Sequence, residues 1–290
     1  MNAMTQMLNT AYMVERMSNE AYHSRPEFSS SQLKDLLRSG AHFYVNNVTK
    51  EAKKESSAAM NFGTLIHTMF LEPECFNDEF VIAPEFNRRT KDGKAQAEAW
   101  EAANVGKMLV TQEQVENACR AAEQLRSLSS YKVMQNNYCL NEASIFFTDP
   151  VYGLQLRIRP DSHIPPCHAL PNGLILDVKS TTDARPHGFS KKCADFAYDL
   201  SAAMYQEGFQ QYYNTEQKPD FLFLVVESST PFNVKQYKAD DIFLAVGAKR
   251  YEQAKENLAE SLLLNEWDGY STELEEISLP NYLVNKALDF

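Results

Sequence analysis

The sequence has no uninterrupted apolar stretch close to the roughly 20 residues that a membrane-spanning helix needs. Residues 1–16 carry neither the basic start nor the apolar run of a secretory signal peptide. The five cysteines are scattered, odd in number and never spaced as C-x-x-C, which argues against a zinc knuckle and against a disulfide framework. These absences predict a protein of the reducing cytoplasm with no membrane partner.

Positive charge is also scarce. The chain has 28 Lys and Arg residues against 39 Asp and Glu residues, which gives a net charge of −11. A protein that coats nucleic acid needs a basic face, so the total charge disfavours that class. It does not exclude an enzyme that holds DNA in a local basic groove, and carboxylates that bind a metal ion would themselves add negative charge.

A length of 290 residues lies at the upper end of what one hydrophobic core supports. We expect one domain over residues 1–290, with a helical N-terminal part at about 17–130 and a sheet-containing catalytic core at about 138–265. Residues 1–25 show little periodicity. The spacing of apolar residues predicts helices over 28–39, 58–71, 94–105, 112–128, 196–213 and 239–264. Branched and aromatic runs predict strands over 138–148, 153–159, 173–180, 221–227 and 232–237. This order favours an α/β fold with a mixed central sheet flanked by helices.

The chemistry is concentrated between the second and third predicted strands. Asp161 ends one strand, and Asp177 and Lys179 lie on the next. Alternate residues of a strand share a face, so Asp177 and Lys179 point the same way while Val178 points into the core. If the two strands pair, two carboxylates and an ammonium converge in a way that suits Mg²⁺ or Mn²⁺ and phosphodiester hydrolysis. A chance D-x-K on an exposed strand is the ordinary alternative.

These residues resemble the motif of the PD-(D/E)xK nuclease superfamily, with Pro160-Asp161 as "PD" and Asp177-Val178-Lys179 as "(D/E)xK". Upstream, Gly63 and His67 resemble the G-x-x-x-H helix of RecB-like and RecE-like nucleases. The resemblance implies a PD-(D/E)xK nuclease core. It also implies that His67, Asp161 and Asp177 bind Mg²⁺ or Mn²⁺ and that Lys179 is catalytic. A core histidine is the alternative for His67.

Further segments resemble the catalytic domain of RecE-type exonucleases (exonuclease VIII), over roughly residues 17 to 265. Residues 28–34 with 39–43 are similar to the opening S-x-S-x-L helix of that family, and residues 87–94 to its R-R-T-K-x-G-K stretch. Glu142 matches an acidic position on the first strand of the sheet. Gln206 matches the glutamine of a Q-x-x-x-Y motif, but Gln210 stands where the tyrosine belongs. Tyr205 or Tyr212 could replace that tyrosine from an adjacent turn.

The RecE-type resemblance implies a catalytic set of Lys179, Asp161, Asp177, Glu142 and Gln206. It implies a Mg²⁺-dependent exodeoxyribonuclease, in a bacterial host or encoded by a phage or prophage, that degrades linear duplex DNA from its ends in the 5′ to 3′ direction. Such enzymes form a ring of subunits and pass the 3′ single strand to an annealing protein of the RecT type. The alternatives are a Cas4-like or RecB-like nuclease of other polarity, and a non-catalytic DNA-binding module with a nuclease fold.

Basic residues around the predicted site are candidates for DNA binding. Arg88, Arg89, Lys91 and Lys94 form a cluster in a loop, and Arg159 flanks Asp161. We expect these five side chains to contact DNA phosphates. Short charge runs are more often ordinary solvated surface, which is the competing interpretation.

Overall fold

The computed structural model describes residues 11–52, 58–84, 86–279 and 284. Its largest sheet has five strands in the order β10-β9-β8-β7-β4. β8 and β9 run parallel, and the other pairs are antiparallel, so the sheet is mixed, as the sequence predicts. The five strands are β4 (Leu140–Asn141), β7 (Ser162–Ile164), β8 (Leu174–Thr181), β9 (Asp220–Glu227) and β10 (Val234–Lys238).

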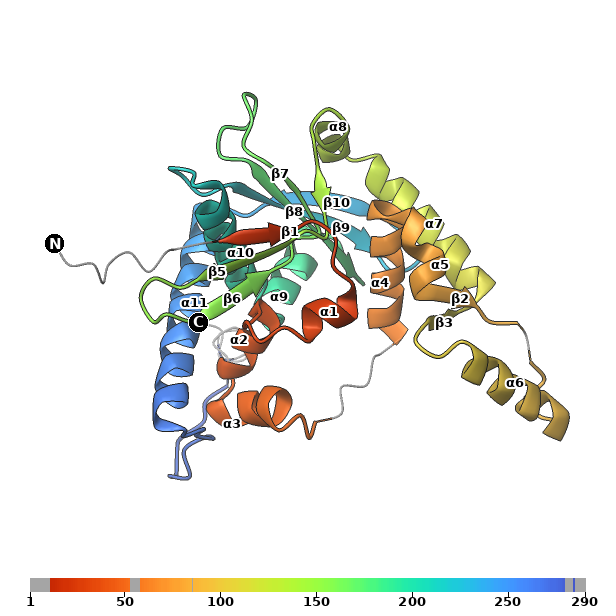
Figure 1. Cartoon of the computed structure of the whole chain (residues 1–290), viewed down its shortest axis with the longest axis horizontal. Coiled ribbons are helices and arrows are strands. Elements are labelled where there is room, and N and C mark those ends of the chain that lie inside the picture. The colour runs from red at the N-terminus through yellow and green to blue at the C-terminus, as the bar shows by residue number, and fades with distance from the viewer. Residues whose placement is uncertain (1–10, 53–57, 85, 280–283, 285–290) are drawn as a thin grey trace.

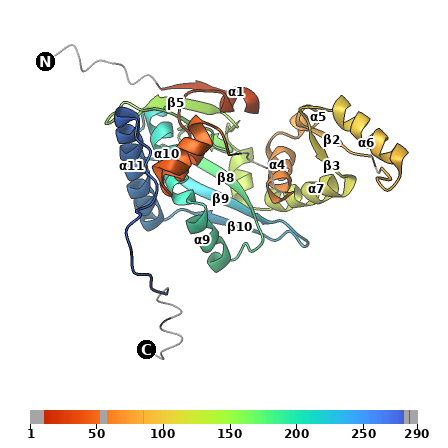
Figure 2. The same ribbon diagram turned by 90° about the horizontal axis from the view of Figure 1, so that it is seen from below.

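Helices cover both faces of this sheet, which confirms the predicted α/β class. Helices α4 (Ala58–Leu71) and α7 (Gln112–Arg126) pack on one face, against a core that includes Val178. Helices α9 (Pro186–Asp195) and α10 (Tyr198–Tyr213) cover the other face, against a core that includes Ile175 (Figures 1 and 2). The alternation along β8 therefore puts Val178 on the α4 side and Asp177 and Lys179 on the α10 side, as predicted.

A second, antiparallel sheet has the order β1-β5-β6 and stands beside α10 (Figure 1). Its strands are β1 (Tyr12–Val14), β5 (Ser144–Thr148) and β6 (Gln155–Ile158). Helices α2 (Ser30–Leu36) and α11 (Asp241–Leu264) pack with α10 in the same core. Within the stretch of little periodicity at residues 1–25, the described part holds β1 and helix α1 (Asn19–His23). A three-residue strand that pairs with distant β5 leaves too short a pattern to detect.

Two strand relationships differ from those that the sequence suggested. The strand expected over 138–148 is divided at Glu142, whose φ of 49° ends β4 before β5 begins in the other sheet. The strand before Asp161 is β6, which pairs with β5 and not with β8. Asp161 follows it in the connection to β7, and β7 supplies the pairing with β8.

The remaining elements form the periphery. The parallel strands β2 (Phe80–Ile82) and β3 (Met108–Val110) lie with α4, α7 and helix α6 (Lys91–Ala103) in a lobe to the right in Figures 1 and 2. The other helical segments are short: α3 (Gly40–Phe43), a π-helix (Tyr44–Val48), a 3-10 turn (Pro73–Cys75), α5 (Phe76–Glu79) and α8 (Ser129–Gln135). Among the described residues, no helix is long and apolar enough to cross a membrane.

Candidate active site

The candidate site lies where β7 stops pairing with β8. The last paired residues are Ser162 and Leu176. Continued by two residues, this register would set Pro160 opposite Val178, but proline has no N–H to donate to a ladder. Side chains bond to the Val178 backbone instead. Asp161 Oδ2 accepts the Val178 N–H at 2.6 Å, and His67 Nε2 lies 2.9 Å from the Val178 carbonyl oxygen.

The contact to Val178 fixes the orientation of the His67 ring. A carbonyl oxygen can only accept, so Nε2 donates a proton to it and Nδ1 is the ring nitrogen left to bind a metal ion. Nδ1 faces Asp161 Oδ2 at 3.5 Å. Helix α4 comes close to β8 through Gly63, because a Cβ added there would lie 3.1 Å from Ser180 Oγ. The G-x-x-x-H spacing thus places a small residue at the contact and the histidine one turn later.

Glu142 completes a cluster of possible ligands. Its left-handed backbone turns the chain between β4 and β5, and its N–H donates to the Asp161 carbonyl at 3.1 Å. One ligand atom from each of His67, Glu142 and Asp161 lies within 4.8 Å of the others. Burial raises the pKa of Glu142 well above its ordinary value, and the nearby Asp161 carboxylate raises it further. Two crowded carboxylates and an imidazole suit a divalent cation.

Asp177 and Lys179 form an ion pair beside this cluster. Burial raises the pKa of the Asp177 carboxyl, although Lys179 opposes the shift. Burial lowers the pKa of Lys179, but the Asp177 and Asp161 carboxylates outweigh it and hold this pKa above its ordinary value. Lys179 is therefore a cation at neutral pH. Asp177 is outside the three-residue cluster, so its role as a metal ligand stays a prediction.

Comparison with known proteins identifies the family of the chain. The family described as "PDDEXK-like domain of unknown function (DUF3799)" matches residues 29–280. The chain belongs to this PDDEXK-like family. The PD-(D/E)xK resemblance is therefore confirmed, whereas the RecE-type assignment stays a prediction. None of the curated proteins compared with the chain is similar to it.

One solved structure shows a similar fold. A protein from Eubacterium rectale, titled "Putative exonuclease", is 15% identical with a TM-score of 0.58. The alignment covers 93% of this chain and 98% of that protein. A second structure, titled SSO0001, is 10% identical over 69% of this chain and 84% of its own, and its TM-score of 0.32 is too low to indicate a shared fold.

The glutamine predicted from the Q-x-x-x-Y motif bonds to the backbone just before β9. Gln206 is buried on α10, and its Nε2 donates to the Pro219 carbonyl at 2.6 Å. The neighbouring Tyr205 is close enough to Asp161 and Asp177 for both carboxylates to raise its pKa, after the larger effect of burial. Tyr212 packs against Tyr213, with ring centroids 4.7 Å apart. Of the two candidate tyrosines, Tyr205 is the one that the fold brings to the site.

The structure buries Arg159, which the sequence suggested as a DNA contact. Its Nε donates to Ser144 Oγ at 2.9 Å, and its NH1 donates to Asn19 Oδ1 at 2.9 Å. Its NH2 donates to the Met17 carbonyl at 3.0 Å, and its guanidinium lies 3.9 Å from the centre of the Tyr22 ring. These contacts hold the N-terminal segment on the second sheet. The position of Arg159 therefore gives no support to a phosphate contact.

The predicted basic cluster is exposed but does not adjoin the carboxylates. Arg88 and Arg89 precede α6, and Lys91 and Lys94 lie in its first turn behind the N-cap Thr90. Both views place α6 in the peripheral lobe, away from α9, α10 and α11 (Figures 1 and 2). Arg88 already pairs with Glu101 at 2.5 Å. Contact of this cluster with DNA stays a prediction.

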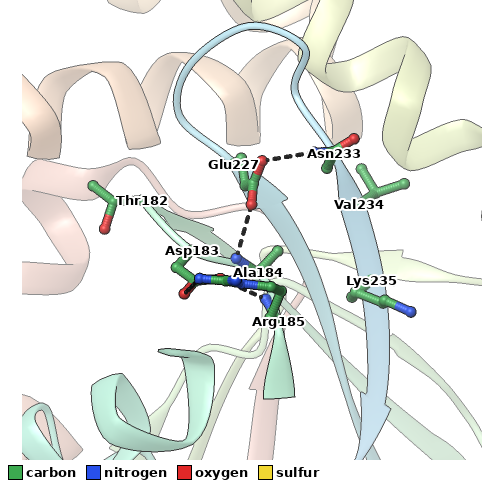
Figure 3. A pocket seen from close by; sticks show the side chains of 8 residues that line it. All are labelled: Thr182, Asp183, Ala184, Arg185, Glu227, Asn233, Val234 and Lys235. Atoms are coloured by element: carbon green, nitrogen blue, oxygen red, sulfur yellow. Dashed lines mark hydrogen bonds and ion pairs between the residues drawn. The ribbon is translucent and has the colours of Figure 1, made fainter. Parts of the chain in front are cut away.

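A hollow of about 480 Å³ lies beyond the carboxyl ends of β8 and β9 (Figure 3). Glu227 accepts the Ala184 N–H at 3.2 Å and the Asn233 side-chain amide at 3.0 Å. Asp183 is paired with Arg185. These groups bond to one another, and the lining residues do not include the proposed catalytic side chains.

Proposed function

We propose that the chain is a divalent-metal-dependent exodeoxyribonuclease that degrades linear duplex DNA from an end. The observation that supports this most is the convergence of His67, Glu142 and Asp161 beside the Asp177–Lys179 pair, at the open edge of β8. A binding module would have no chemical need for crowded carboxylates next to a partly buried lysine.

Each protein group has a defined task in hydrolysis. A bound Mg²⁺ or Mn²⁺ would supply Lewis acidity and a more acidic water. His67, Glu142 and Asp161 would hold it, with Asp177 as a further candidate ligand. Lys179 is kept protonated by Asp177, so it donates hydrogen bonds to a phosphate oxygen or orients the attacking water; it is not the base in this arrangement.

The finer features of the proposal come from resemblance. The RecE-like motifs favour an exonuclease, 5′ to 3′ polarity, a ring of subunits and transfer of the 3′ strand to an annealing protein of the RecT type during recombination. The Eubacterium rectale protein of similar fold carries the word exonuclease in its title. A RecB-like or Cas4-like nuclease of other polarity is the alternative that uses the same site.

The test is digestion of linear and covalently closed circular duplex DNA, with Mg²⁺, with Mn²⁺ and with a chelator. We expect acid-soluble nucleotides from linear DNA only, in the presence of metal, and none from the Asp161→Asn variant. Duplexes with one end blocked at its 5′ or its 3′ terminus would then assign polarity. Cutting of closed circles would indicate an endonuclease, and metal-independent binding without cleavage would indicate a binding module.

A further inference from the structure

Two lysines share one aromatic ring at the candidate active site. Lys179 Nζ on β8 lies 5.2 Å from the centre of the Tyr198 ring, and Lys34 Nζ on α2 lies 5.3 Å from the same centre. Both distances are within the range of a cation–π contact. Helix α2 therefore places a second ammonium group close to the proposed catalytic lysine.

The packing of α2 on α10 holds this second lysine in place. Ser30 and Lys34 are four residues apart and lie on one face of α2. Tyr198 and Tyr205 are seven residues apart and lie on one face of α10. The two faces meet, because Ser30 lies close enough to Tyr205 to affect its pKa and Lys34 lies over Tyr198.

Lys34 has no hydrogen-bond acceptor or ion-pair partner among the residues that the structure describes. Two carboxylates are near enough to act on it, but Asp177 is paired with Lys179, and Asp199 with Arg250 at 3.0 Å. Burial, together with the positive charge of Lys179, lowers the pKa of Lys34 to about 8. A partly buried ammonium without an acceptor is unfavourable until an anion reaches it.

We propose that Lys34 binds a phosphate group of the DNA strand, next to the phosphate that Lys179 contacts. The inference rests on the proposed function and assigns to α2 a direct part in holding the substrate. A lysine ammonium is a compact charge that suits a phosphate oxygen. A phosphate ligand also explains why the described residues offer Lys34 no acceptor, since the acceptor would arrive with the substrate.

The test compares Lys34→Met, which keeps the length of the side chain and removes its charge, with Lys132→Met. Lys132 is an exposed residue of α8, which lies at the opposite end of Figure 1 from α2. Binding of a short duplex is measured by fluorescence anisotropy in Ca²⁺ over a range of salt concentrations. We expect the dissociation constant of Lys34→Met to rise about tenfold at low salt, and the slope of log affinity against log salt to flatten by about 0.9. Lys132→Met should match the parent, and Lys34→Arg should keep most of the affinity.

Thermal unfolding separates substrate binding from a structural role. Removing an unpaired, partly buried charge should leave the melting temperature of Lys34→Met unchanged or raised. Parental affinity and salt slope in Lys34→Met would overturn the inference, as would a loss of binding that only follows a loss of folded protein. In either case an active parent enzyme would leave the proposed function intact. A parent protein that neither binds nor cuts DNA would overturn both.

Discussion

Asp161 accepts the backbone N–H of Val178 at 2.6 Å, at the point where Pro160 can no longer extend the ladder between β7 and β8. The carboxylate replaces a strand partner and also belongs to the metal-ligand cluster with His67 and Glu142. The two residues of the "PD" motif thus act together. Proline ends the strand pairing, and the carboxylate of the following aspartate accepts the Val178 N–H that has lost its strand partner.

The two roles of Asp161 can be separated by comparing Asp161→Asn with Asp161→Ala. Both variants lose a carboxylate ligand, and both relieve repulsion with Glu142. We expect nuclease activity and Mn²⁺ affinity to fall by more than about a hundredfold in each. Only asparagine keeps an oxygen for the Val178 N–H, so Asp161→Ala should be less stable than Asp161→Asn by about 1–3 kcal/mol. Calorimetry and chemical denaturation measure the two effects, and unaltered Mn²⁺ binding in both variants would refute the ligand assignment.

The role of His67 is tested with His67→Gln. A glutamine amide can still donate to the Val178 carbonyl, but it does not replace the imidazole nitrogen that faces Asp161. We expect a melting temperature close to that of the parent and a fall of about 10–100-fold or more in turnover and Mn²⁺ affinity. If His67 were only a core residue, the variant would lose about 1–3 kcal/mol of stability while the folded fraction kept its activity.

The basic cluster is tested by charge reversal. If Arg88, Arg89, Lys91 and Lys94 contact phosphates, reversing all four should weaken binding to every duplex sequence. The slope of log affinity against log salt should flatten by about 0.9 for each phosphate that the variant no longer neutralises. The matched control reverses four exposed lysines elsewhere in the fold: Lys132, Lys218, Lys235 and Lys249. If the two quadruple variants had the same DNA affinity and the same salt slope in Ca²⁺, the cluster would be ordinary solvated surface.

Regular periodicity made much of the fold readable from the sequence. The predicted helix over 58–71 coincides with α4, and the long closing helix begins only two residues later than predicted. Repeating apolar positions and residues that mark a helix end made these two helices predictable. Asp177 and Lys179 were placed on a common face because alternation along a strand is a local geometric rule.

Features that depend on packing between distant segments could not be predicted from the sequence. The break at Glu142 depends on a left-handed backbone conformation, which a glutamate in the sequence does not predict. This break divides one predicted strand between two sheets. Arg159 was assigned to DNA because it flanks Asp161, but its contacts come from Asn19 and Met17, far away in the chain. Lys34 was not singled out at all, because only the packing of α2 on α10 brings it to Tyr198.

Stability should depend on pH through His163, which is fully buried on β7. Its Nε2 lies 2.9 Å from the Tyr213 hydroxyl, and burial lowers its pKa to about 4. The unfolded chain, with an ordinary histidine pKa of about 6.5, binds more protons than the folded protein between these values. This histidine therefore lowers the free energy of unfolding as pH falls below about 6.5, by about 2 kcal/mol between pH 7 and pH 5. The loss stops growing below about pH 4.

The measurement is denaturant unfolding of the parent, His163→Phe and His168→Phe at pH 7 and pH 5. Phenylalanine does not titrate and can pack against Phe209, so His163→Phe should lose about 2 kcal/mol less than the parent on acidification. Its stability at pH 7 is not the criterion, because the bond to Tyr213 is lost at both pH values. His168 is exposed, and its replacement should leave the parental pH dependence in place. If His163→Phe lost as much free energy of unfolding between pH 7 and pH 5 as the parent, the His163 imidazole would be protonated in the folded protein or would reach solvent.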